Sequence, residues 1–124
     1  LQFQFAAAAA RHKVSQLVLV SSVGARLDSG FFYMRMKAEL ERDVSGLPFE
    51  RIVIVRPGPL FGKRRKQRLG ESLGVFITRS LNRIGLIRSM RPISGDKVAR
   101  AMVNASFMQG KGLRIYESDE LFSL

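Results

Sequence analysis

A four-residue apolar run, residues 17–20, ends directly at Ser21 and Ser22 and constrains the fold more than any other feature of the chain. Strands of a parallel sheet that are covered on both faces are continuously apolar rather than alternating. In open α/β sheets, ligands bind at the carboxyl ends of such strands. We therefore expect the two serine hydroxyls to lie at a ligand-binding edge of a parallel sheet.

A second run rich in β-branched residues, residues 49–56, is stopped by Pro57 and a glycine. The two runs are separated by a helical pattern, and the repeat of roughly 35 residues has the length of a strand–helix–strand unit. The two strands of such a unit are parallel, so their carboxyl ends share one edge of the sheet. We expect Ser21, Ser22 and the segment 57–62 to line one crevice there.

The segment between the two runs predicts a helix over residues 31–45. Tyr33 and Lys37 stand four residues apart and therefore share one face of this helix. Taken without the surrounding motifs, the pair favours the edge of an amphipathic helix with no role in binding. The expected apolar stripe of the helix consists of Phe32, Met36, Leu40, Val44 and Leu47.

The rest of the chain predicts a basic loop at 63–70, a helix at 71–82, a helix from Ser94 to about residue 108, and a short strand at 113–116. The basic loop is most simply a solvated segment. The expected core residues of the helix after Ser94 are Val98, Met102, Ala105 and Phe107.

Composition bounds the function classes. The chain has 124 residues, 46% of them apolar and 25% charged, with no cysteine and one histidine, so we expect one soluble, cytoplasmic domain at most, without a disulfide or metal site. It lacks a signal-peptide pattern and a membrane-spanning run, and its start reads as internal. The net charge of +11 permits an anionic partner. Nucleic acid ranks last, because no zinc-finger pattern or interleaved aromatic residues accompany the basic run.

Five ordered motifs resemble the short-chain dehydrogenase/reductases, and most of all their atypical, extended-type branch of Tat-interacting oxidoreductase-like proteins. They are Ser-Ser-Val-Gly-Ala at 21–25, Tyr33 and Lys37 in Tyr-x-x-x-Lys spacing, Leu-Pro-Phe-Glu-Arg at 47–51, Arg-Pro-Gly-Pro-Leu at 56–60, and a glycine-led basic segment at 62–71. In that family the cofactor phosphates bind a Gly-rich loop upstream of the serine motif. No such glycine motif precedes Ser21 in this sequence. The resemblance thus implies an α/β fold, with residues 1–124 as the C-terminal portion of a Rossmann-like parallel sheet and its flanking helices.

The resemblance also implies roles for single residues. Tyr33 would be the proton donor and acceptor, and the ammonium of Lys37 would favour its phenolate. Ser21 or Ser22 would bind the substrate oxygen, and Ser21 is preferred because it lies twelve residues before Tyr33. The implied cofactor contacts are Tyr33, Lys37, Pro57, Leu60 and Arg68, with Arg64 less secure.

The implied function is an NAD(P)-dependent oxidoreductase, or its catalytic-side fragment, acting on a small carbonyl or alcohol substrate. NADP(H) is preferred over NAD(H) because of the basic surroundings. The alternative is a non-catalytic NAD(P)H-binding regulatory or interaction protein of the same fold, since fold does not dictate activity.

Overall fold

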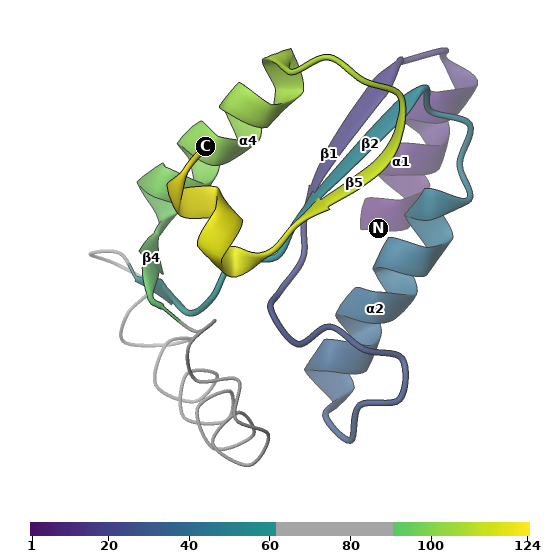
Figure 1. Ribbon diagram of the computed structural model, residues 1–124. Helices are drawn as coiled ribbons and strands as arrows, with labels where there is room; N and C mark the ends of the chain where they lie inside the picture. The colour runs from purple at the N-terminus through teal and green to yellow at the C-terminus, as the bar shows by residue number, and fades with distance from the viewer. Residues whose placement is uncertain (62–90) are drawn as a thin grey trace.

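A computed structural model describes residues 1–61 and 91–124 of the chain (Figure 1). Its centre is a parallel sheet of three strands, β1 (Gln16–Val20), β2 (Arg51–Val55) and β5 (Gly112–Tyr116), in the order β1-β2-β5. Helices flank the sheet on both faces. The predicted class, an α/β fold with part of a Rossmann-like parallel sheet, is confirmed.

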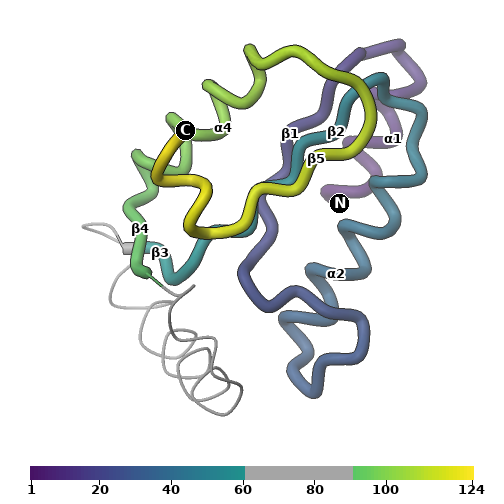
Figure 2. Tube along the Cα trace, viewed as in Figure 1, coloured from purple at the N-terminus to yellow at the C-terminus, as the bar shows by residue number. Residues whose placement is uncertain are grey.

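Two helical layers enclose the sheet. Helices α1 (Gln2–Arg11) and α2 (Phe32–Ser45) contact each other on one side, and α4 (Gly95–Phe107) lies on the other with the 3₁₀ helix η2 (Ser118–Phe122) (Figures 1 and 2). A separate pair of short parallel strands, β3 (Leu60–Phe61) and β4 (Ile93–Ser94), joins the segment after β2 to the start of α4.

The predicted strand–helix–strand unit is confirmed. Strands β1 and β2 pair in parallel, with Leu17 opposite Ile52 and Val20 opposite Val55, and α2 forms the crossover between them. The carboxyl ends of the two strands therefore lie side by side, which places the chain segments that follow them at one edge of the sheet.

Strand β2 forms the middle of the core because both of its faces are covered. All five of its residues are buried. Val53 and Val55 belong to the cluster beneath α4, together with Ile93, Val98, Ala101, Ala105, Tyr116 and Leu121. Because side chains alternate along a strand, Ile52 and Ile54 face the opposite layer. This double coverage explains why the strand is apolar without alternation.

The predicted apolar stripe of α2 is wrong in its first two turns. Phe32 is 73% exposed and Met36 is 42% exposed. The helix instead buries Met34, Ala38, Glu41 and Val44. The helix is rotated relative to the apolar pattern because small Ala38 permits close approach and because the carboxylate of Glu41 has an ion-pair partner, described below.

The helix predicted after Ser94 is confirmed as α4. The Ser94 hydroxyl accepts a hydrogen bond from the backbone N–H of Lys97 at 3.1 Å, which is an N-cap interaction. Val98 and Ala105 are buried as expected, but Phe107 is 82% exposed, so its assignment to the core is wrong. Phe107 is the last residue of α4, where the helix extends past the sheet-facing cluster.

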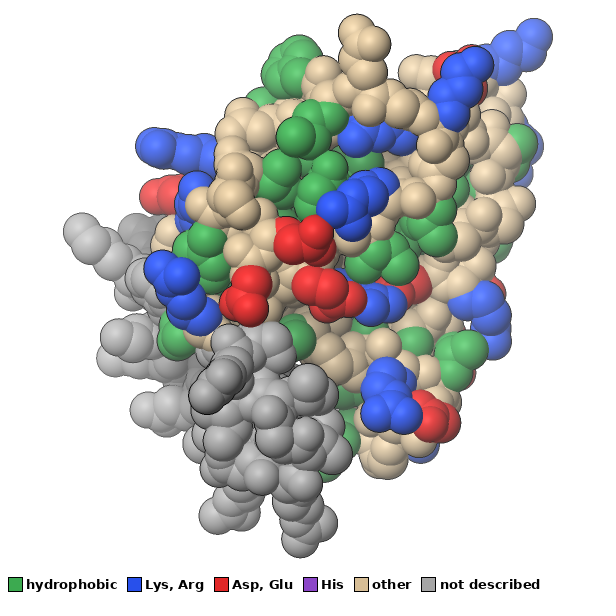
Figure 3. All heavy atoms as spheres, viewed as in Figure 1, with side chains coloured by type: hydrophobic (Ala, Val, Ile, Leu, Met, Phe, Trp, Pro, Cys, Tyr) green, Lys and Arg blue, Asp and Glu red, His purple; other side chains and the backbone are tan. Residues whose placement is uncertain are grey.

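Charges of opposite sign intermix on the face that carries β5 and η2 (Figure 3). Arg114 lies 2.8 Å from a carboxylate oxygen of Glu120, and Arg56 lies 2.8 Å from one of Glu117. Within the described residues, this face therefore presents paired charges rather than a continuous basic surface.

Candidate functional site

The loops after β1 and β2 meet at the carboxyl edge of the sheet. The backbone N–H of Ser21 donates to the carbonyl of Val55 at 2.8 Å, and that of Val23 donates to the carbonyl of Pro57 at 3.0 Å. Ser21 and Ser22 therefore lie beside the Pro57 segment, as the sequence predicts for this edge.

The two serine hydroxyls differ in their hydrogen bonding. Both residues are buried, with exposed fractions of 4% and 6%. The Ser22 hydroxyl donates to the carbonyl of Val23 at 3.2 Å. The Ser21 hydroxyl has no hydrogen-bond partner within residues 1–61 and 91–124. A buried polar group left without a partner costs about 1–3 kcal/mol, so Ser21 is the one of the pair that a ligand oxygen would satisfy.

The amine of Lys37 reaches the same strand end from α2. Its Nζ donates to the carbonyl oxygen of Val20, the residue before Ser21, at 3.5 Å. Burial lowers the pKa of Lys37, and the negative charge of Glu41 one turn further along α2 opposes this shift. An ammonium makes three hydrogen bonds, so two of its protons remain for another acceptor at this edge.

Tyr33 lies beside this edge, packed against Val23 and Met34. Its ring centroid is 5.8 Å from the Nζ of Lys37, and within the described part of the chain its hydroxyl makes no hydrogen bond to Ser21 or Lys37. Burial raises the pKa of the Tyr33 phenol. Burial is thus the effect that shifts the pKa of the phenol here, and the role of Lys37 in favouring the phenolate stays a prediction.

The remaining predicted contacts are spread along the segment after β2. Pro57 is buried at the edge, and Leu60 in β3 is 50% exposed. Arg64 and Arg68 lie outside the described residues, as do the predicted basic loop and the helix at 71–82.

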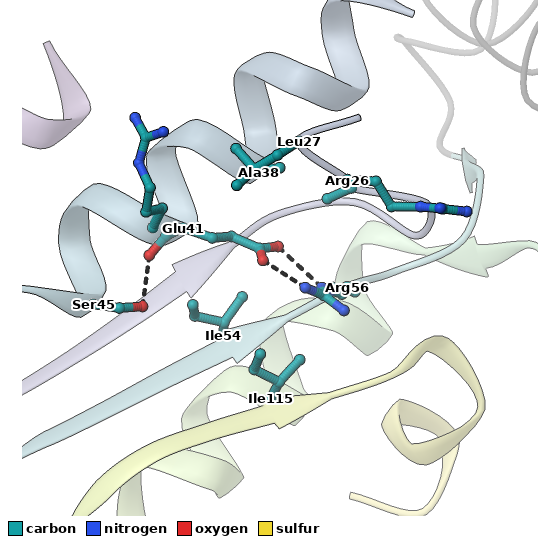
Figure 4. Close-up of a pocket in the computed structure, with 10 residues that line it drawn as sticks. Arg26, Leu27, Ala38, Glu41, Ser45, Ile54, Arg56 and Ile115 are labelled. Carbon is teal, nitrogen blue, oxygen red and sulfur yellow. Dashed lines mark hydrogen bonds and ion pairs between the residues drawn. The ribbon is translucent and has the colours of Figure 1, made fainter. Parts of the chain in front are cut away.

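Sequence reasoning missed a three-residue ion-pair network centred on Arg56. The Arg56 side chain donates to both carboxylate oxygens of Glu41, from Nε at 3.0 Å and from Nη2 at 2.6 Å (Figure 4). It also donates from Nη1 to a carboxylate oxygen of Glu117 at 2.8 Å. These hydrogen bonds raise the pKa of Arg56 further above its ordinary range. Two features of the sequence could have indicated this network: Glu41 lies four residues after Lys37, and Arg56 lies at the end of a predicted strand.

A cavity of about 260 Å³ adjoins this network on the α2 side of the sheet (Figure 4). Its apolar lining includes Ile54 and Ile115, and its charged lining includes Arg26, Arg42, Arg56 and Glu41. Each of the three arginines is paired with a carboxylate of the chain. Among the described residues, none of the predicted site residues lines this cavity, but Arg26 and Arg56 of its lining belong to the segments that follow β1 and β2. The cavity therefore adjoins the carboxyl edge of the sheet without including Ser21, Tyr33 or Lys37.

The described residues offer neither a metal site nor a membrane-spanning helix. No group of three or more histidine, aspartate and glutamate side chains there could hold a metal ion. None of the helices described for residues 1–61 and 91–124 has the length and apolar character needed to cross a membrane.

Comparison with known proteins finds similarity to fungal proteins named FMP52, mitochondrial; no protein-family model matches the chain. The Saccharomyces cerevisiae protein is 42% identical over 84% of this chain and 47% of its own length. The Scheffersomyces stipitis protein FMP52-1 is 37% identical over the whole chain and 58% of its own length. The Aspergillus clavatus protein is 39% identical over 96% of this chain and 49% of its own length. The chain thus spans about half the length of the curated relatives it matches.

These findings correct three predictions. The relatives are named FMP52 proteins, and neither a short-chain dehydrogenase/reductase nor a Tat-interacting oxidoreductase is among those names. The assignment to that family and the predicted oxidoreductase function are therefore wrong. The predicted cytoplasmic location is also wrong, because the relatives are named as mitochondrial proteins.

Proposed function

We propose that this chain forms one wall of a nucleotide-binding crevice in a mitochondrial protein, and that NADP(H) binds at the sheet edge formed by Ser21, Tyr33 and Lys37. The proposal is one of binding alone and includes no reaction. The mitochondrial setting comes from the names of the relatives.

The buried hydroxyl of Ser21 is the observation that carries this proposal. It lies at the carboxyl end of β1 without a partner among the described residues, which is where ligands of open α/β sheets bind. A hydroxyl there can donate to, or accept from, a ligand oxygen, which would offset the cost of its burial.

Lys37 and Tyr33 supply complementary contacts for a nucleotide. The ammonium of Lys37, held near Val20, has two further protons for ribose hydroxyl or phosphate oxygens. The neutral phenol of Tyr33 offers both a donor and an acceptor, and its ring offers a flat apolar surface. The preference for NADP(H) over NAD(H) rests on the excess of basic residues, which favours the additional phosphate.

The test is binding of NADPH and NADH to the full-length protein, measured by calorimetry. We expect micromolar binding of NADPH, and about tenfold weaker binding for Ser21→Ala, equivalent to about 1.4 kcal/mol. Ser22→Ala is the matched control, because the Ser22 hydroxyl already donates to Val23, and it should change the affinity less than twofold. Absent binding of either dinucleotide, or equal losses in the two serine variants, would contradict the proposed site.

The mitochondrial setting is tested separately by fractionating cells that express the full-length protein. We expect it to sediment with mitochondria and to resist protease until the membranes are opened. Recovery in the cytosolic fraction alone would contradict this part of the proposal without bearing on ligand binding.

A further inference from the structure

Tyr33, Lys37 and Glu41 form a line along α2, at spacings of four residues. Side chains spaced in this way are neighbours on the helix surface, and a lysine and a glutamate at this spacing ordinarily pair. Here the Nζ of Lys37 donates to the carbonyl of Val20 instead, at 3.5 Å. The carboxylate of Glu41 is engaged elsewhere.

Arg56 occupies both oxygens of that carboxylate. The contacts at 2.6 Å and 3.0 Å form a bidentate fork, in which the guanidinium matches the planar carboxylate (Figure 4). The pair is shielded from solvent, with side chains that are 22% and 9% exposed for Arg56 and Glu41. Salt therefore screens it less than it would screen an exposed pair.

The same guanidinium connects three elements. Arg56 directly follows β2, Glu41 lies in the middle of α2, and Glu117 directly follows β5. The fork fixes how far α2 can slide along the sheet, since a shift along the helix axis would separate the two pairs of atoms. Tyr33 and Lys37 are carried on the same rigid helix, about two turns and one turn before Glu41, respectively.

We infer that Arg56 and Glu41 are positioning residues of the sheet-edge site: their fork anchors α2 to the end of β2 and keeps the Glu41 carboxylate away from Lys37, which leaves the Lys37 ammonium directed at the edge beside Ser21. The inference rests on the proposed function only for the identity of the ligand. The position and charge state of Lys37 can be tested without any ligand.

Two substitutions should move Lys37 in opposite directions. In Arg56→Gln, the Glu41 carboxylate loses its fork and becomes free to pair with Lys37, so the pKa of Lys37 should rise by about half a unit or more. In Glu41→Gln, the nearby negative charge is lost and burial remains, so the pKa should fall. The charged or titratable groups concerned are Tyr33 and Glu41 on α2 and Arg56 after β2. Loss of the Arg56 charge by itself would also raise the pKa of Lys37, so Arg56→Lys, which keeps the charge but not the fork, separates the two effects.

The measurement is an NMR titration of the Lys37 side chain in the full-length protein. Arg42→Gln is the matched control, because Arg42 lies on the same helix, carries the same charge and pairs with Asp43 on the exposed surface. It should leave the pKa of Lys37 within about 0.2 unit of the wild type. Arg56→Lys keeps the charge without the fork and provides a folded variant should Arg56→Gln unfold; it should give a smaller rise.

Shifts of the same sign in the Arg56 and Glu41 variants, or a shift in Arg42→Gln as large as theirs, would overturn the inference. NADPH affinity is the second readout, and we expect it to fall at least fivefold in Arg56→Gln and less than twofold in Arg42→Gln. If the wild-type protein binds no dinucleotide while the Arg56 and Glu41 variants shift the pKa of Lys37 in opposite directions, the proposed function is contradicted and the positioning role is still supported.

Discussion

Tyr33 has a phenol that is harder to ionise than a free tyrosine. Burial raises its pKa above the ordinary value of about 10. We expect the absorbance difference at 295 nm between wild type and Tyr33→Phe to show a titration midpoint above pH 10. Because the folded-state pKa is raised, the stabilising contribution of the protonated phenol is complete below about pH 10 and is lost as the pH rises through the folded value. A midpoint below 10 would contradict the structure.

At the residue scale, the sequence allowed part of the site to be predicted. The spacing of Tyr33 and Lys37 and the position of Ser21 after an apolar run depend only on local periodicity, and the structure has them as expected. The pKa direction of Tyr33 and the fork between Arg56 and Glu41 depend on burial and on a contact that spans 15 residues. Local patterns do not contain that information.

The N-cap of α4 gives a prediction for a single element. The Ser94 hydroxyl satisfies the backbone N–H of Lys97, so Ser94→Ala should destabilise the protein by about 1 kcal/mol. Ser106→Ala is the control, since the Ser106 hydroxyl only donates to the carbonyl of Val103 within the same helix and should cost less than about 0.5 kcal/mol. Urea unfolding measures both. Equal losses would show that the cap contributes nothing particular.

The rotation of α2 gives a second prediction at this scale. Phe32 is largely exposed, whereas Ile54 on β2 is fully buried. Phe32→Ser should therefore change the free energy of unfolding by about 0.5 kcal/mol or less, and Ile54→Ala should cost about 2–5 kcal/mol. A large loss for Phe32→Ser would instead favour the stripe read from the sequence. The apolar pattern of the helix could not indicate this rotation, because the arginine that allows Glu41 to be buried comes from another element.

At the scale of the whole molecule, the three strands of the main sheet and helices α2 and α4 were predictable, but the short pair β3 and β4 and the surroundings of the sheet were not. Strand and helix bounds depend on apolar runs, a cap at Ser94 and breakers such as Pro57, all of which are local. The outer side of β1 is different. Its five residues are only partly buried, while all five of β2 are buried, although both runs are similarly apolar. The apolar pattern of β1 alone therefore does not indicate what packs beside this strand.

The outer edge of β1 therefore carries a prediction. The N–H of Ser21 points to β2, and backbone N–H directions alternate along a strand, so those of Val18 and Val20 point away from β2. The matched relatives are about twice as long as the chain, and we propose that their remaining half extends the sheet at this edge. Hydrogen exchange of the Val18 and Val20 amides should then be at least about 100-fold slower in the full-length protein than in residues 1–124 alone. The Leu19 and Ser21 amides, which face β2, are the internal control and should change much less. Equally fast exchange of Val18 and Val20 in both proteins would mean that no strand pairs there.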